Sequence, residues 1–122
     1  MKIGIISSNA KLYSTSRLTS AARARGHTVK ILHTQNFSIN IRSNEPGLLY
    51  KSKPLPHLDA IIPRVAASQN FMGTAVIRQF EQMGVYSLNA SHAISVARDK
   101  LRSLQILSRH RVGIPESMFV MG

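Results

Sequence analysis

The sequence predicts an α/β protein in which helices cover both faces of an open, mainly parallel sheet. Three observations lead to this fold class: short apolar segments alternate with amphipathic ones, glycines stand where the helices would end, and polar turns follow the apolar segments. The chain has 122 residues, of which 43% are hydrophobic, and this suffices for one buried core but not comfortably for two. We therefore expect a single domain over residues 1–122.

The first half of the chain is typical of a strand, a helix and a second parallel strand. Residues 2–7 form a continuous apolar run around Gly4, the pattern of a strand buried on both faces. Residues 14–16 offer N-caps for a helix that ends at Gly26, and residues 27–33 form the next strand. The inward face of this helix is predicted to contain Leu18, Ala21 and Ala22.

The middle of the chain departs from the alternation and then resumes it. Residues 36–52 are predicted to form a hairpin-like excursion with a turn at Glu45-Pro46-Gly47. A buried strand follows at 59–63, then a helix over 69–83 that ends at Gly84. The helix is predicted to bury a stripe made of Met72, Val76, Phe80 and Met83.

The last third contains a fourth strand and two further helices. The strand spans residues 85–88, Ser91 is a candidate N-cap for a short helix, and Asp99 is a candidate N-cap for another. The apolar stripe of the last helix consists of Leu101, Leu104 and Leu107, with Ile106 alongside.

Composition excludes several kinds of site. There is no cysteine, which removes disulfides, zinc-thiolate centres and cysteine nucleophiles, suits a reducing compartment and leads us to expect a cytoplasmic protein. The five acidic residues are scattered, so neither a carboxylate pair nor a magnesium cluster is predicted. Glycine-rich nucleotide motifs and membrane-length apolar runs are absent as well. We assign no catalytic residue and no metal ligand within the chain.

Polar residues follow each predicted strand, at 7–9, 33–34, 63–64 and 88–91, where ligands of such sheets bind. From these we select Ser7, Ser8, Asn9 and Arg64 as candidate substrate-binding residues, Arg64 because a guanidinium can hold a carboxylate or phosphate. The alternatives are ordinary turn residues and a solvated arginine.

Lys100 is the remaining candidate. With Asp99 as N-cap, Lys100 is the first residue of a helix and lies beside free N–H groups, so it is suited to bind a phosphate. The alternative is an ordinary exposed lysine paired with Asp99.

Four segments resemble the N-terminal domain of RimK-type enzymes. They are residues 12–18, LPHLDAIIPR at 55–64, residues 78–89, and ARDKLRSLQIL at 97–107. An Asp-Lys pair before an apolar helix is found in ATP-grasp enzymes generally, whereas the combination resembles RimK, which adds glutamates to the C-terminus of ribosomal protein S-six. The resemblance covers nearly the whole chain and is weakest at 34–52.

The resemblance implies a preATP-grasp, Rossmann-like domain of a carboxylate–amine ligase that works through an acyl phosphate. ATP and magnesium would be its cofactors, with Lys100 near the nucleotide phosphates and the metal ligands in a C-terminal ATP-grasp domain absent from this chain. Its partners would be that domain, glutamate and the C-terminal tail of a small-subunit ribosomal protein, with no membrane and with homo-oligomerisation left open. The 122 residues are expected to be inactive alone.

The charge of the chain supports a second hypothesis. Sixteen Lys and Arg against five acids give a formal charge of +11, which attracts polyanions. A small basic nucleic-acid-binding module is therefore the alternative, although the few aromatic residues form no known RNA-binding signature.

Overall fold

A computed structural model describes all residues, 1–122, and contains a four-stranded parallel sheet. The strand order is β2-β1-β6-β7, and every neighbouring pair is parallel. The strands are β1 (Lys2–Ser7), β2 (Thr28–His33), β6 (Ala60–Arg64) and β7 (Tyr86–Ser87). This confirms the predicted open sheet, although its fourth strand is shorter than predicted.

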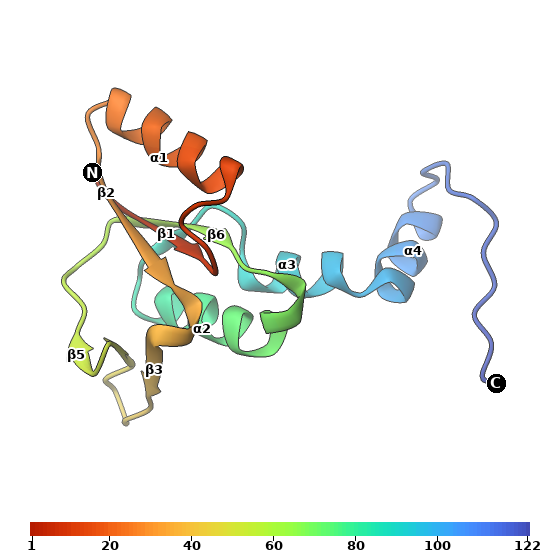
Figure 1. The fold of residues 1–122 in the computed structure, drawn as a ribbon. Helices are drawn as coiled ribbons and strands as arrows, with labels where there is room; N and C mark the ends of the chain where they lie inside the picture. The colour runs from red at the N-terminus through yellow and green to blue at the C-terminus, as the bar shows by residue number, and fades with distance from the viewer.

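Two helices cover the two faces of the sheet. Helix α1 (Tyr13–Ala24) connects β1 to β2, and α2 (Asn70–Gln82) connects β6 to β7. Crossovers between parallel strands are right-handed. The crossover from β1 to β2 and the crossover from β6 to β7 run toward opposite edges of the sheet, so α1 and α2 lie on opposite faces. Figure 1 shows α1 above the sheet and α2 below it. The predicted two-sided arrangement is therefore confirmed.

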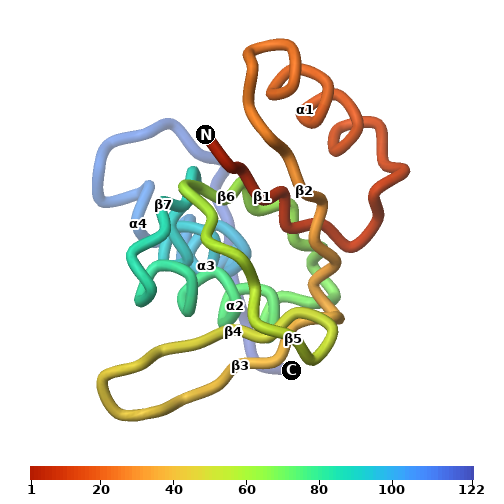
Figure 2. Tube along the Cα trace, turned by 90° about the vertical axis from the view of Figure 1, so that its left-hand side faces the viewer, coloured from red at the N-terminus to blue at the C-terminus, as the bar shows by residue number.

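The predicted excursion at 36–52 is a small antiparallel sheet. It consists of β3 (Phe37–Asn40), β4 (Gly47–Tyr50) and β5 (Lys53–Pro54), preceded by a short 3₁₀ turn, η1 (Thr34–Asn36). The Phe37 ring meets the Phe80 ring of α2 edge to face, with centroids 5.7 Å apart. Figure 2 shows the β3–β4 hairpin beside α2, away from α1. The hairpin thus extends the main core below the sheet.

The buried face of α2 differs from the prediction. Met72 and Met83 are 37% and 38% exposed, whereas Val76, Ile77 and Phe80 are buried. The cause is Gly73, where a Cβ would lie only 2.1 Å from Val65 Cγ1. At this glycine the helix comes close to the segment that follows β6, which includes the 3₁₀ turn η2 (Ala67–Gln69). This close approach turns the buried face of α2 by one position.

The predicted N-cap of α1 is wrong. Leu12 precedes the helix without a side-chain cap, and residues 14–16 lie in the first turn. Thr15 is fully buried, and its hydroxyl is 3.1 Å from that of Ser7, so this side chain joins the helix to β1. The inward face of α1 accordingly contains the buried Thr15 and Thr19, while the predicted Leu18, Ala21 and Ala22 are only half-buried.

The two C-terminal helices begin differently. Helix α3 (Ser91–Arg98) begins at Ser91 itself, so the predicted Ser91 cap is wrong; the carboxylate of Glu81 accepts the Ser91 N–H at 2.7 Å instead. The Asp99 cap is confirmed, since its Oδ1 accepts the Arg102 N–H at 3.0 Å ahead of α4 (Lys100–Arg109). Glu81 thereby ties α2 to α3 through a carboxylate at a helix N-terminus.

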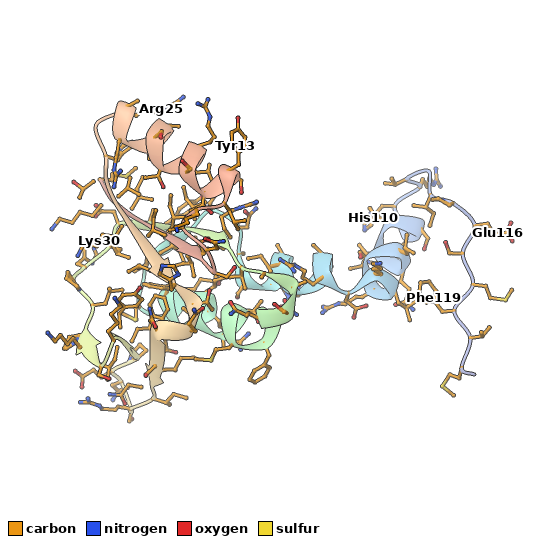
Figure 3. The ribbon with its side chains drawn as sticks, viewed as in Figure 1. Tyr13, Arg25, Lys30, His110, Glu116 and Phe119 are labelled. Atoms are coloured by element: carbon orange, nitrogen blue, oxygen red, sulfur yellow. The ribbon has the colours of Figure 1, made fainter.

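Helix α4 lies apart from the body of the molecule. Two leucines of its predicted apolar stripe are uncovered, Leu101 with 42% and Leu107 with 38% of its surface exposed, whereas Leu104 and Ile106 are half-buried. Figures 1 and 3 show α4 and the following segment, with Phe119, set away from the sheet. None of the helices is long and apolar enough to cross a membrane.

A carboxylate fastens the start of β1. Asp59 Oδ2 accepts the Lys2 N–H at 2.6 Å, and His57 Nε2 lies 3.4 Å from Asp59 Oδ1. The hydrogen bond from Lys2, and then the nearby His57, hold the pKa of Asp59 below its ordinary value.

A carboxyl with a lowered pKa in the folded state stabilises that state at neutral pH and loses its contribution as the pH falls through the folded pKa. Wild type is therefore expected to be more stable than Asp59→Ala at pH 7, and the gap is expected to close in acid, below about pH 4. Urea unfolding of both proteins over a pH series measures the gap. A gap that does not change with pH would contradict this role of the charge.

Gly73→Ala is expected to destabilise the domain by about 1–3 kcal/mol, because the added methyl group meets the stiff, buried Val65 side chain. The matched control is Gly113→Ala, where no atom lies within 4 Å of the added Cβ. Thermal unfolding distinguishes the two. If Gly73→Ala instead gained the roughly 1 kcal/mol that alanine brings to a helix, the close approach would be refuted.

Candidate functional site

A groove of about 470 Å³ opens at the carboxyl edge of the sheet. It forms here because the chain leaves β1 toward α1 and leaves β6 toward α2, so the loops after these neighbouring strands diverge. Its walls come from the loop after β1, the end of β6, the segment after β7 and one side of α3. The sequence predicted that polar strand ends would gather at this edge, and the structure brings three of them together.

The predicted residues Ser7, Ser8 and Asn9 have three different environments. Ser7 is fully buried, and its hydroxyl donates to the Asn9 carbonyl at 3.1 Å and contacts the Thr15 hydroxyl. Ser8 lines the groove. Asn9 lies outside the lining and uses its Oδ1 to accept the Lys11 N–H at 2.9 Å. Ser7 and Asn9 therefore shape the loop, and Ser8 is the one of the three that lines the groove.

Arg64 lines the groove at the end of β6 and is exposed. Its Nη2 donates to the Ser14 hydroxyl of α1 at 3.2 Å. This partner is neutral, and no acidic residue lines the groove, so the guanidinium charge is uncompensated. A carboxylate or phosphate in the groove would meet a directional, bidentate donor here.

Two further polar residues line the groove. Asn89 lies in the segment 88–91, whose polarity after a strand was the available signal. Arg98, at the end of α3, donates from Nη2 to the Val65 carbonyl. Nothing in the sequence indicated this contact, because it joins residues 33 positions apart. Arg98 adds a second cation to the groove and fixes α3 against the chain that follows β6.

Lys100 is exposed and does not line this groove. It is the first residue of α4, and the Asp99 carboxylate next to it is engaged by the Arg102 N–H. No ion pair joins Lys100 to Asp99, since the ion pairs of the structure are Arg42–Glu45 and His57–Asp59. The ammonium group is therefore free to meet an anion.

The groove is suited to binding rather than to bond breaking by itself. Arginine, serine and asparagine side chains supply hydrogen bonds beside the apolar Leu12 and Ile94. It lacks a histidine, a carboxylate or a lysine to transfer a proton. The arrangement fits a small molecule or chain end with a carboxylate or phosphate.

Comparison with known proteins gives consistent results. Residues 1–94 match the family described as the RimK PreATP-grasp domain. A probable alpha-L-glutamate ligase of Hydrogenovibrio crunogenus is 59% identical over 119 residues, and one of Pseudoalteromonas atlantica is 57% identical. These matches cover 98% of this chain but 40% and 39% of the relatives, so the chain spans about two fifths of their length.

Solved structures show the same fold at low identity. The ATP-grasp ligase PsnB in complex with a minimal precursor aligns with TM-score 0.71 and 17% identity over 95% of this chain and 45% of its own. The RimK domain protein ATP-grasp from Sphaerobacter thermophilus gives TM-score 0.72 and 14% identity, over 95% of this chain and 40% of its own.

The different roles of the serines are testable. Ser7→Ala is expected to lower the free energy of unfolding by about 1–3 kcal/mol, because it leaves the buried Thr15 hydroxyl without its side-chain partner. Ser8→Ala is the matched control and is expected to leave stability unchanged, since Ser8 faces the groove. Urea denaturation measures both. Equal stability of the two variants would remove the structural role given to Ser7.

Proposed function

The chain belongs to the RimK preATP-grasp domain family, and we propose on this basis that it works as the N-terminal part of an α-L-glutamate ligase of the ATP-grasp superfamily. One observation carries the proposal: relatives named as probable ligases of this kind are 57–59% identical across 98% of the chain. The reaction joins a carboxylate to the amine of glutamate. ATP would phosphorylate the carboxylate to an acyl phosphate and leave as ADP. The glutamate amine would then attack the acyl carbon and expel inorganic phosphate, and loss of a proton from the nitrogen would leave the amide bond.

In this proposal the groove at the carboxyl edge of the sheet holds a substrate carboxylate. Arg64 would bind it, with Ser8 and Asn89 as neutral hydrogen-bonding partners. Ser7 and Asn9 would contribute by holding the loop that presents Ser8. Support comes from the uncompensated charge of Arg64 and from the lack of acids in the lining.

Lys100 is proposed to bind a phosphate of ATP. Its exposure, its place at the first position of α4 and the engagement of Asp99 elsewhere all support this role. The N-terminal end of a helix adds a partial positive charge at the same point. Magnesium is not assigned to residues of this chain, because no group of three or more His, Asp or Glu comes together in it.

The remaining part of such a ligase, about three fifths of its length, is the proposed partner of α4. The uncovered Leu101 and Leu107 would pack against it and bring Lys100 toward the nucleotide. The proposed acceptor is the C-terminal tail of a small-subunit ribosomal protein, modified in the cytoplasm. The formal charge of +11 is suited to an acidic tail of this kind and to a ribosomal surface.

In the ligase that contains this chain, Lys100→Ala is expected to lower kcat/KM for ATP about tenfold to hundredfold, since a charged hydrogen bond contributes roughly 1.5–3 kcal/mol. Lys100→Arg should recover only part, because a planar guanidinium does not replace a compact ammonium. ATP titrations with glutamate and an acceptor peptide measure this effect.

Arg109→Ala, at the far end of the same exposed helix, is the control and should retain wild-type kinetics. Melting temperatures must match among the variants. Unchanged kinetics in Lys100→Ala would return this residue to an ordinary surface lysine. The ligase function itself would be refuted if the wild-type ligase formed no ADP when glutamate was added in the presence of ATP and the acceptor peptide.

A further inference from the structure

A second groove, of about 700 Å³, lies on the β2 side of the molecule and shares no residue with the first. One wall is the outer edge of β2, and the other is the β4–β5 hairpin with the segment that follows it. Figure 3 shows Lys30 of β2 on this side, at the opposite end of the molecule from His110 and Phe119. The groove is thus remote from α4 and its neighbouring segment.

The lining of this groove is strongly cationic. It contains Lys30, Lys51 and Lys53 together with His33, and no acidic residue. No ion pair engages the three lysines. Four of the five acids of the chain have partners elsewhere: Glu45 with Arg42, Asp59 with His57, Glu81 with the Ser91 N–H and Asp99 with the Arg102 N–H. The charge in the groove is therefore uncompensated and fits an anionic ligand.

The outer edge of β2 also offers backbone hydrogen bonds. Strand β2 ends the sheet and pairs only with β1. The Thr28 N–H donates toward the β1 side, to Met1, whereas the His33 N–H points outward and donates to the Tyr50 hydroxyl at 3.0 Å. Backbone groups alternate sides along a strand, so the N–H and C=O of Ile31 also point outward, into the groove that Ile31 lines.

The turn that carries the second lysine has an unfavourable backbone. Tyr50 pairs with Lys53, and the two residues between them, Lys51 and Ser52, have φ of 50° and 63°. Tight hairpin turns of this conformation favour Asn-Gly, because a Cβ is strained at positive φ. Lys51 nevertheless occupies the position, with its ammonium 5.8 Å from the Tyr50 ring centroid. The turn presents a cation at the groove despite the strain.

From this combination we propose that the second groove binds an acidic peptide in extended conformation. The peptide backbone pairs with the free edge of β2 at Ile31, and its carboxylates meet the ammonium groups of Lys30, Lys51 and Lys53. An extended peptide fits better than a single-stranded nucleic acid, which needs exposed rings for stacking. The aromatic rings of the lining, Tyr50 and His33, are both half-buried. The Tyr50 hydroxyl accepts the His33 N–H, and the Tyr50 ring packs edge to face on Phe37. The binding needs neither ATP nor the ligase reaction.

The test is fluorescence anisotropy of a labelled oligoglutamate peptide with the 122-residue chain at low salt. The double variant Lys51→Gln/Lys53→Gln is expected to weaken binding about fivefold to tenfold. The matched control, Arg17→Gln/Arg78→Gln, removes the same charge from exposed positions on α1 and α2. It is expected to weaken peptide binding about twofold or less. A peptide methylated at alternate backbone nitrogens should bind about as weakly to wild type as the parent peptide does to the groove variant.

A second variant separates binding from folding. Lys51→Asn/Ser52→Gly relaxes the turn, so it is expected to raise the melting temperature while weakening peptide binding. The proposal is overturned if both charge-removing variants weaken binding equally or if backbone methylation has no effect. It is likewise overturned if an oligouridylate of matched charge binds more tightly than the peptide and depends on the same two lysines.

Discussion

Strand β1 has a parallel neighbour on each side, and the positions of both grooves depend on this pairing. Ile5 lies between Ile31 of β2 and Ile62 of β6, so all three strands end at the same edge. The chain then leaves β1 and β6 toward opposite faces, which opens the groove with Arg64 between them. Because β2 is the last strand on its side, the same pairing leaves its outer edge free for the second groove.

Local patterns sufficed to predict elements whose stability comes from nearby residues. The apolar run of β1, the Asp99 cap and the glycine that ends α2 were all predictable, because each depends on residues close in sequence. The errors occur where distant residues intervene. Gly73 turns the face of α2 through its contact with Val65, and Glu81 takes the capping role expected of Ser91.

The candidate site divides in the same way. The topology of alternating segments predicts that polar strand ends share one edge, and Ser8 and Arg64 do line one groove there. Their individual environments were not predictable. Ser7 and Ser8 are neighbours of the same type, but strand β1 ends between them: Ser7 is its last, buried residue, whereas Ser8 lies in the following loop and lines the groove. Arg98 reaches the groove through a contact with a backbone carbonyl, which no side-chain pattern reveals.

The uncovered leucines of α4 have a consequence for when this part of the molecule is ordered. A helix of ten residues with two of its leucines exposed to water is shorter than the roughly 12–15 residues below which isolated helices are at best marginally stable. Rapid opening and closing of α4 follows, with fast amide exchange along the helix and slow exchange in β1. In the proposed ligase, docking of the leucines would repay the ordering entropy, so assembly of the two parts would also act as the switch that fixes the ammonium of Lys100 in place.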